Sequence, residues 1–137
     1  MEFTQGVRFD SLGLTEEVQR ALKKKNIEES TPVQAGCIPP MREWKDVIAK
    51  APTGTGKTFA FGIPIIEHIE PGSEETEAVI LAPTRELAMQ ITAELRDLAV
   101  FMSGIRVVCL YGGAPIGKQI DALKKKPQIV VATPGRL

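Results

Sequence analysis

Apolar and polar residues follow two rhythms along this chain, one typical of buried strands and one typical of amphipathic helices. Short apolar runs at 47–51, 78–82, 106–111 and 128–132 predict four strands. The segments between them carry apolar residues at helical spacing, and the clearest stripe consists of Leu87, Ile91, Leu95 and Leu98. Several runs are apolar on both faces, so we predict an α/β fold in which helices cover a mostly parallel sheet on two sides.

Two further helices are predicted ahead of the first strand. Thr15 is expected to cap the first of them, and the lysine run 23–25 suits its last turn. That position explains the lysines better than a nucleic-acid patch does. The second helix is expected to begin at Pro32 and to stop near residues 39–40.

The balance of charge limits the kind of partner that this chain can attract. Its 137 residues include 17 Lys and Arg against 17 Asp and Glu, for a formal net charge of zero. Any nucleic-acid surface must therefore be local. Cys37 and Cys109 lack metal-like spacing and are interpreted as free thiols, which fits a reducing compartment. No apolar run approaches membrane-spanning length and no signal peptide is evident, so we expect a soluble, cytoplasmic protein.

Residues 51–58, with the sequence APTGTGKT, lie between a predicted strand and a helix-compatible run, as in a phosphate-binding loop. Gly54 and Gly56 allow the backbone to curl, so that successive N–H groups point at the phosphates of a nucleotide. Lys57 can reach the outer phosphates, and the Thr58 hydroxyl can ligate the Mg²⁺ that bridges them. The alternative is a Gly/Thr-rich turn that happens to contain Lys. The flanking strand and helix favour nucleotide binding.

Two more strand-to-helix junctions share this design. Residues 83–86 and 133–136 each place a Thr where it can cap a helix and an Arg beside the exposed N–H groups. A pair of glycines, 112–113, follows a third strand and allows close backbone approach. Parallel strands end at one edge of a sheet, so these segments are expected to meet there. Either junction alone is best explained by helix capping with a surface arginine, whereas together they predict contacts to a nucleic-acid backbone.

Gln34 and Phe9 give a separate indication of adenine. The amide of Gln34 can accept from the adenine N6 amino group and donate to N7, a pairing that guanine matches less well. The ring of Phe9 can cover one face of the base. Taken singly, these residues are better interpreted as a helix-surface glutamine and a core aromatic.

In their order along the chain, these segments resemble the motifs of the first RecA-like domain of DEAD-box ATP-dependent RNA helicases. The motifs matched are the adenine-recognition (Q) motif at 9–34, motif I at 51–58, motif Ia at 83–87, the glycine doublet at 112–113 and motif Ib at 133–136. The resemblance implies that residues 1–137 form the N-terminal portion of a three-layer RecA-like P-loop domain, truncated to about four strands. It also implies a parent enzyme that couples ATP hydrolysis to the unwinding or remodelling of RNA duplexes.

The resemblance assigns a role to residues of each motif. Lys57 and Thr58 would be catalytic, and Thr58 would ligate Mg²⁺. The residues that would bind ATP are Phe9, Ile27, Gln34, Pro52, Thr53, Gly54, Thr55, Gly56, Lys57 and Thr58. Those that would hold the RNA backbone, without reading its sequence, are Pro83, Thr84, Arg85, Gly112, Gly113, Thr133, Pro134, Gly135 and Arg136.

The chain departs from the general phosphate-loop pattern at one position and from the family pattern at others. Ala51 stands where the phosphate-loop pattern opens with Gly, Asn26-Ile27 where Gly and an aromatic are usual, and Ser30 where Pro is usual. The sequence stops before the Asp-Glu-Ala-Asp motif, the Ser-Ala-Thr motif and the second RecA-like domain, which would bring arginine fingers. We therefore expect this fragment to bind ATP or ADP weakly, to hydrolyse ATP negligibly and to self-associate through an open sheet edge.

Three other functions fit part of the pattern. A related superfamily 2 motor that acts on DNA would have the same loop and junctions, although the segment with Phe9 and Gln34 favours the RNA family. A non-catalytic RNA-binding or regulatory module would retain the fold and lack the acidic motif. A small-molecule kinase would leave the two Thr/Arg junctions unexplained.

Overall fold

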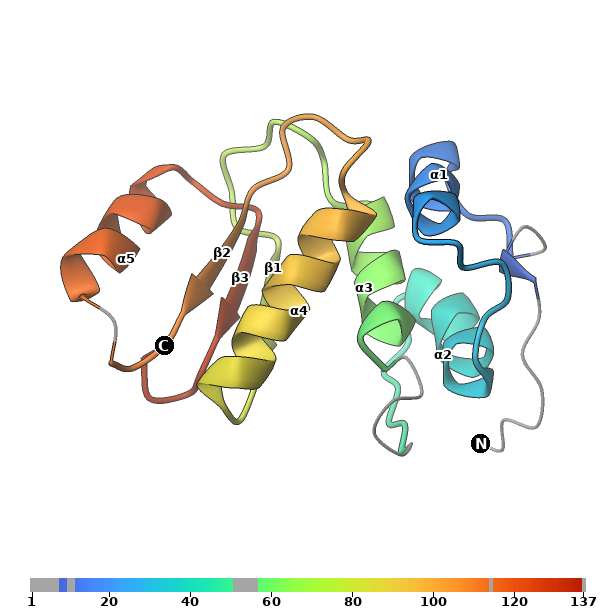
Figure 1. Cartoon of the computed structure of the whole chain (residues 1–137), viewed down its shortest axis with the longest axis horizontal. Helices are drawn as coiled ribbons and strands as arrows, with labels where there is room; N and C mark the ends of the chain where they lie inside the picture. The colour runs from blue at the N-terminus through green and yellow to red at the C-terminus, as the bar shows by residue number, and fades with distance from the viewer. Residues whose placement is uncertain (1–7, 10–11, 51–56, 114, 137) are drawn as a thin grey trace. The chain divides into compact units, whose positions relative to one another are not determined.

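The residues described by the computed structural model are 8–9, 12–50, 57–113 and 115–136. They divide into a first unit, Met1–His68 with Leu98–Phe101, and a second unit, Ile69–Asp97 with Met102–Leu137. The elements, drawn in Figure 1, are α1 (Glu16–Lys24), α2 (Pro32–Arg42), α3 (Lys57–His68), β1 (Ala78–Leu81), α4 (Arg85–Leu98), β2 (Val107–Leu110), α5 (Ile116–Lys124) and β3 (Ile129–Ala132). None of the helices within the described ranges is long and apolar enough to cross a bilayer.

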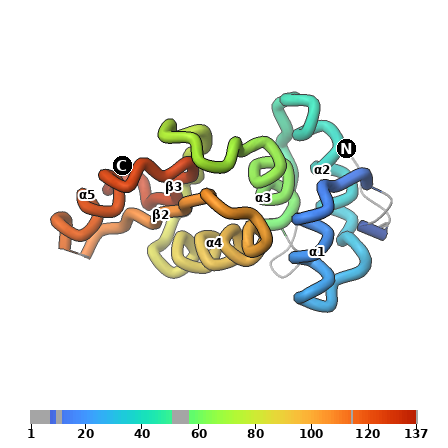
Figure 2. Tube along the Cα trace, turned by 90° about the horizontal axis from the view of Figure 1, so that it is seen from above, coloured from blue at the N-terminus to red at the C-terminus, as the bar shows by residue number. Residues whose placement is uncertain are grey.

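The first unit is built on three helices, and α3 contacts both of the others (Figure 2). The residues that α1 buries are Val18, Ala21 and Leu22. Between α2 and α3, Val33, Cys37 and Ala60 form one core cluster. Burial raises the pKa of the Cys37 thiol above its ordinary value, because desolvation disfavours the charged thiolate.

A nearly buried carboxylate fastens both other helices to α3. Glu67 accepts a hydrogen bond of 2.7 Å from the backbone N–H of Thr15, at the start of α1. Its other carboxylate oxygen lies 3.2 Å from Nε of Arg42, the last residue of α2. The Arg42 guanidinium also donates to the carbonyls of Leu12 and Gly13. One charged pair therefore holds the entry to α1 and the end of α2 against α3.

This clamp explains two differences from the sequence-based expectation. The predicted stop of α2 near residues 39–40 is wrong, because the helix continues to Arg42 with both prolines inside it. Proline removes a hydrogen-bond donor but keeps a helical φ, and the contacts of Arg42 hold the final turn in place. Thr15 does occupy the N-cap position of α1, but its side chain makes no cap hydrogen bond. Its backbone N–H serves Glu67 instead.

The strand predicted at 47–51 is also wrong for the part that the structure describes. Residues 47–50 form neither helix nor strand, and residue 51 lies outside the described ranges. Val47 packs against the cluster between α2 and α3, whereas Ile48 is 98% exposed. A strand requires a hydrogen-bonded neighbour, and the three described strands pair only with one another. An apolar run does not reveal whether such a neighbour exists.

The second unit contains a parallel sheet in the order β1-β3-β2, with β3 in the middle (Figure 1). All four residues of β3 are buried. The pairing is in register, so that Ala132 of β3 aligns with Leu81 of β1 and with Leu110 of β2. The predicted α/β fold and its parallel sheet are confirmed, with three described strands that are each one or two residues shorter than their apolar runs.

One face of this sheet is only partly covered. The buried cluster on that face, with Ala122 of α5 packed against it, consists of Val108, Leu110, Val130 and Ala132. By register, Val79 and Leu81 of β1 share the face, yet they are 54% and 56% exposed. β1 is thus an edge strand with uncovered apolar positions. Self-association through this edge stays a prediction.

Gln128 fixes the loops at the amino end of the sheet. Its side-chain oxygen accepts from the N–H of Arg106 at 2.7 Å. Its side-chain nitrogen donates to the carbonyls of Ser73, at 2.9 Å, and Gly104, at 2.7 Å. The residue is fully buried. Because a buried amide is costly unless it is hydrogen-bonded, these three bonds determine the position of the chain on both sides of β3.

We expect Gln128→Leu to lower the free energy of unfolding by about 2 kcal/mol, because the partly buried N–H of Arg106 loses its acceptor. The carbonyls of Ser73 and Gly104 each lose one of two donors, since Arg106 Nη2 still donates to the first and Gly72 N–H to the second. The matched control is Gln90→Leu on α4, where the exposed amide lies 3.5 Å from Glu94. That change should alter stability by no more than about 0.5 kcal/mol. Urea unfolding followed by circular dichroism measures both. Equal losses in the two variants would contradict the role given to Gln128.

Candidate functional site

The three strands of the second unit end at the same level, and their following segments leave from one edge. The ladder continues past the strand ends, since Ala82 N–H donates to the carbonyl of Ala132 at 2.9 Å. Thr133 N–H donates in the same way to the carbonyl of Leu110 at 3.0 Å. Segments 83–85, 112–113 and 133–136 begin within two residues of these points. The sequence expectation that they share the carboxyl edge of the sheet is confirmed.

Arg85 reaches from the start of α4 toward the end of β2. The helix is capped by Thr84, whose hydroxyl accepts from the N–H of Leu87 at 3.2 Å. The guanidinium of Arg85 lies over the ring of Tyr111, 5.7 Å from its centroid. A Cβ placed on Gly113 would be 3.9 Å from the same guanidinium. Arg85 therefore lies beside the turn that follows β2.

Arg136 is held to the same part of the sheet by α5. Its Nη1 donates to the side-chain oxygen of Gln119 at 3.2 Å. The side-chain nitrogen of Gln119 donates in turn to the carbonyl of Tyr111 at 2.9 Å. The backbone N–H of Arg136 donates to the carbonyl of Thr133, which closes a turn after β3. Tyr111 is thus linked to both arginines, through its ring and through its carbonyl.

The carboxyl edge presents cations and accessible backbone, which suits an extended polyanion. Of the nine residues predicted to hold a nucleic-acid backbone, seven are exposed, while Thr133 and Arg136 are half-buried. Guanidinium groups bind phosphate with charge-assisted hydrogen bonds. One carboxylate also lies at this edge: Oε1 of Glu86 is 3.8 Å from Nε of Arg85. Sequence reasoning missed Tyr111 and Gln119; a polar residue at a buried position of α5 was the available signal.

Lys57 and Thr58 are the first two residues of α3, in the first unit. Lys57 is exposed and Thr58 is half-buried. The remainder of the predicted phosphate loop, with Pro52, Thr53, Gly54, Thr55 and Gly56, lies outside the described residues. A helix N-terminus with these two side chains provides amide dipoles, an ammonium group and a hydroxyl.

Among the described residues, no group of three or more His, Cys, Asp or Glu side chains is arranged to hold a metal ion. At the start of α3, the Thr58 hydroxyl is an oxygen donor of the kind that Mg²⁺ accepts.

Gln34 is not the surface glutamine that sequence reasoning weighed, since it is only 3% exposed. Its side-chain oxygen accepts from Thr31 N–H at 2.9 Å, and its own backbone N–H donates to the Thr31 hydroxyl at 3.4 Å. These reciprocal bonds form a capping box at the start of α2. The spacing of Thr31 and Gln34 carries that signal in the sequence.

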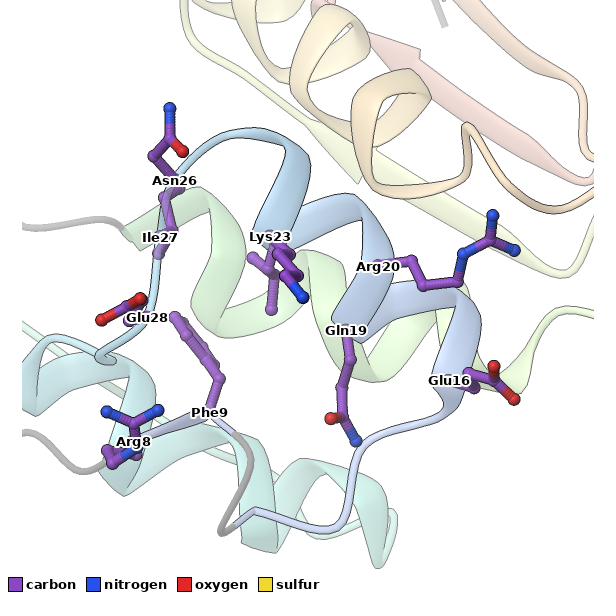
Figure 3. Close-up of a pocket in the computed structure, with 10 residues that line it drawn as sticks. Arg8, Phe9, Glu16, Gln19, Arg20, Lys23, Asn26, Ile27 and Glu28 are labelled. Atoms are coloured by element: carbon purple, nitrogen blue, oxygen red, sulfur yellow. The ribbon is translucent and has the colours of Figure 1, made fainter.

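Phe9 and Ile27, both predicted to contact adenine, line one cavity of about 570 Å³ in the first unit. Phe9 is held there by a hydrogen bond of 3.0 Å from its N–H to the carbonyl of Glu28. Its ring lies between Glu28 and Lys23 of α1, while the side chain of Arg20 points away from Phe9 (Figure 3). Gln34 is not among the lining residues. The structure therefore brings together two of the three predicted adenine contacts.

The chain matches the sequence model of the DEAD/DEAH box helicase family over residues 31–137. It is 48% identical over 129 residues to the DEAD-box ATP-dependent RNA helicase CshA of Geobacillus kaustophilus, covering 94% of this chain and 27% of that protein. It is 47% identical over 131 residues to the protein of the same name from Bacillus subtilis, covering 96% of this chain and 26% of that one. The chain thus spans about a quarter of the length of these relatives.

Solved structures give the same result. A DEAD box protein from the hyperthermophile Methanococcus jannaschii superposes with a TM-score of 0.87 at 39% identity, over 94% of this chain and 35% of that one. A hypothetical ATP-dependent RNA helicase from Sulfolobus tokodaii superposes with a TM-score of 0.81 at 37% identity, over 90% of this chain and 35% of the other.

The two glycines of the 112–113 pair have different backbone requirements. Gly113 has φ of +91°, a conformation that strains any residue with a side chain, whereas Gly112 lies outside that region. A Cβ on Gly112 would meet nothing within 4 Å, and one on Gly113 would make only an ordinary contact with Arg85. The need for glycine at 113 therefore comes from the backbone.

We expect Gly113→Ala to destabilise the protein by about 1–2 kcal/mol, through the cost of a left-handed conformation for an L-residue. Gly112→Ala should be neutral or slightly stabilising, because it lowers the entropy of the unfolded chain without strain. Thermal unfolding of the two variants tests the contrast. Equal destabilisation by both would mean that the turn requires something other than φ.

Proposed function

Because the chain belongs to the DEAD/DEAH box helicase family, we propose that it is part of an ATP-dependent RNA helicase. In that protein it would form one side of the ATP site and part of the RNA-binding surface. The observation that carries this proposal is the meeting of Arg85, Arg136 and the Gly113 turn at one edge of a parallel sheet. An RNA substrate and the two free thiols also fit a cytoplasmic location.

On the RNA side, Arg85 and Arg136 would bind successive phosphates of one strand. The exposed Thr84 and Gly113 would let the RNA backbone approach closely, as would the other exposed residues of the three segments. Such contacts position a strand without reading its bases, so the substrate class is RNA of any sequence. Discrimination against DNA would require contacts to the ribose 2′-hydroxyl.

On the nucleotide side, Lys57 and Thr58 would act with residues 52–56 of the predicted phosphate loop 51–58. Lys57 would reach the outer phosphates, and Thr58 would ligate Mg²⁺, which neutralises phosphate charge when it is bound. Phe9 and Ile27 would provide an apolar wall for adenine. Gln34 would share its oxygen between Thr31 and the adenine N6 amino group, and its side-chain nitrogen would donate to N7.

Hydrolysis by this chain alone is expected to be negligible. Positioning and charge stabilisation account for most of the catalysis of phosphoryl transfer, and they require groups on several sides of the phosphates. The chain spans about a quarter of the length of its CshA relatives, so we expect activity to require the whole protein and take binding as the property to test in this chain.

For RNA, we expect Arg85→Ala and Arg136→Ala each to weaken binding of a fluorescent single strand equally across unrelated sequences. Each change should also lower the slope of log affinity against log salt by roughly 0.7, the value for one lost phosphate contact on a single strand. Lys124→Ala is the control, because Lys124 ends α5 just before β3, at the opposite end of the sheet. Unchanged affinity and slope in both arginine variants would refute the RNA surface.

For ATP, Gln34→Glu separates the capping role from the nucleotide role. Glutamate keeps an oxygen for Thr31 N–H, so stability should stay within about 1 kcal/mol of the unmodified chain. It has no N–H to donate to adenine N7, so affinity for a fluorescent ADP analogue should fall roughly tenfold. Gln34→Ala should lose both stability and affinity. ADP binding that is unaffected by Gln34→Glu would remove Gln34 from the nucleotide site.

A further inference from the structure

Gln119 occupies an unusual place on α5. It is 7% exposed, whereas Ile116 and Ile120 on the same helix are 62% and 46% exposed. An amide is costly to bury and an isoleucine is not, so hydrophobic burial alone would favour the opposite orientation of the helix. The inward position of Gln119 is therefore maintained by its hydrogen bonds.

These hydrogen bonds use both ends of the Gln119 amide and fix its orientation. The side-chain nitrogen donates to the carbonyl of Tyr111 at 2.9 Å, and the side-chain oxygen accepts from Nη1 of Arg136 at 3.2 Å. A carbonyl can only accept and a guanidinium can only donate, so the amide cannot be turned over without losing both bonds. The oxygen of Gln119 is therefore always presented to Arg136.

We propose that Gln119 is a positioning residue for RNA binding, one that sets the guanidinium of Arg136 before the strand arrives. This proposal rests on the function proposed above. A long side chain loses rotamer freedom when it binds, and this loss weakens affinity unless the side chain is already ordered. A bond from Gln119 to the half-buried Arg136 orders the side chain during folding, so less freedom remains to be lost on the RNA.

Tyr111 extends this arrangement to the other arginine. Its carbonyl anchors Gln119, and its ring lies under the guanidinium of Arg85 at 5.7 Å. Arg136, through Gln119, and Arg85, through a direct ring contact, are thus both positioned by Tyr111 just after β2. Two phosphate-binding groups held in this way keep a constant separation, as a strand with regularly spaced phosphates requires.

If Gln119 had a purely structural role, Gln119→Leu would lower stability, and its effect on RNA affinity would not depend on whether Arg136 is present. A double-mutant cycle on RNA affinity is therefore the appropriate test. Gln119→Leu preserves the volume of the buried side chain and removes both bonds. We expect it to weaken single-stranded RNA binding by roughly three- to tenfold, the cost of ordering one long side chain. The salt slope should stay unchanged, because the charge of Arg136 is still present.

The cycle gives the decisive comparison. In an Arg136→Ala background, Gln119→Leu should reduce RNA affinity little further, because the arginine that Gln119 positions is absent. In an Arg85→Ala background, Gln119→Leu should reduce RNA affinity by its full factor. Gln90→Leu, the same chemical change at an exposed site of α4, should leave RNA affinity unaltered in every background. Where Gln119→Leu fails to fold, Gln119→Met provides an unbranched apolar replacement with the same expected cycle.

The outcomes separate this inference from the function on which it rests. If Arg136→Ala weakens binding but Gln119→Leu does not, or if the two losses simply add, Gln119 does not position Arg136. If neither Arg136→Ala nor Arg85→Ala affects RNA binding, the RNA surface itself is refuted.

Discussion

The hydrogen bonding of β3 on both sides, in register with β1 and with β2, is the constraint on which the candidate RNA surface depends. The three strands end at one level, at Leu81, Leu110 and Ala132, because the two ladders share the central strand β3. Segments that are far apart in sequence therefore emerge side by side. A shift of one residue in either ladder would exchange the two faces of a strand and move its end out of line with its neighbours, so the register with β3 determines the edge.

Buried side-chain amides do much of the remaining positioning. Gln128 joins three backbone groups at the amino end of the sheet, Gln119 joins Tyr111 to Arg136 at the carboxyl end, and Gln34 closes the first turn of α2. An amide has a donor and an acceptor on one rigid plane, so it can connect unlike groups in a fixed order. In the first unit, the charged pair of Glu67 and Arg42 has the same role.

Much of this architecture is predictable from the sequence, and the failures have specific physical causes. The apolar runs at 78–82, 106–111 and 128–132 do form strands, as predicted, because each has a hydrogen-bonded neighbour among the described residues. The run at 47–51 looks equally strand-like, but the described residues provide no neighbour for it. The end of α2 was misplaced because Arg42 is held by contacts distant in sequence. The arginines and glycines of the edge were predicted from their junctions, whereas Tyr111 and Gln119 become visible only when β2 and α5 are placed together.

The buried thiol of Cys37 has a practical consequence for spectroscopy. Its raised pKa and its place in the α2–α3 cluster disfavour attack on maleimides near neutral pH, while the half-buried Cys109 belongs to β2. Cys109 lies two residues before Tyr111. A small reporter group attached there would sense rearrangement at the strand terminus without any engineered cysteine, and the native chain thus carries its own labelling position.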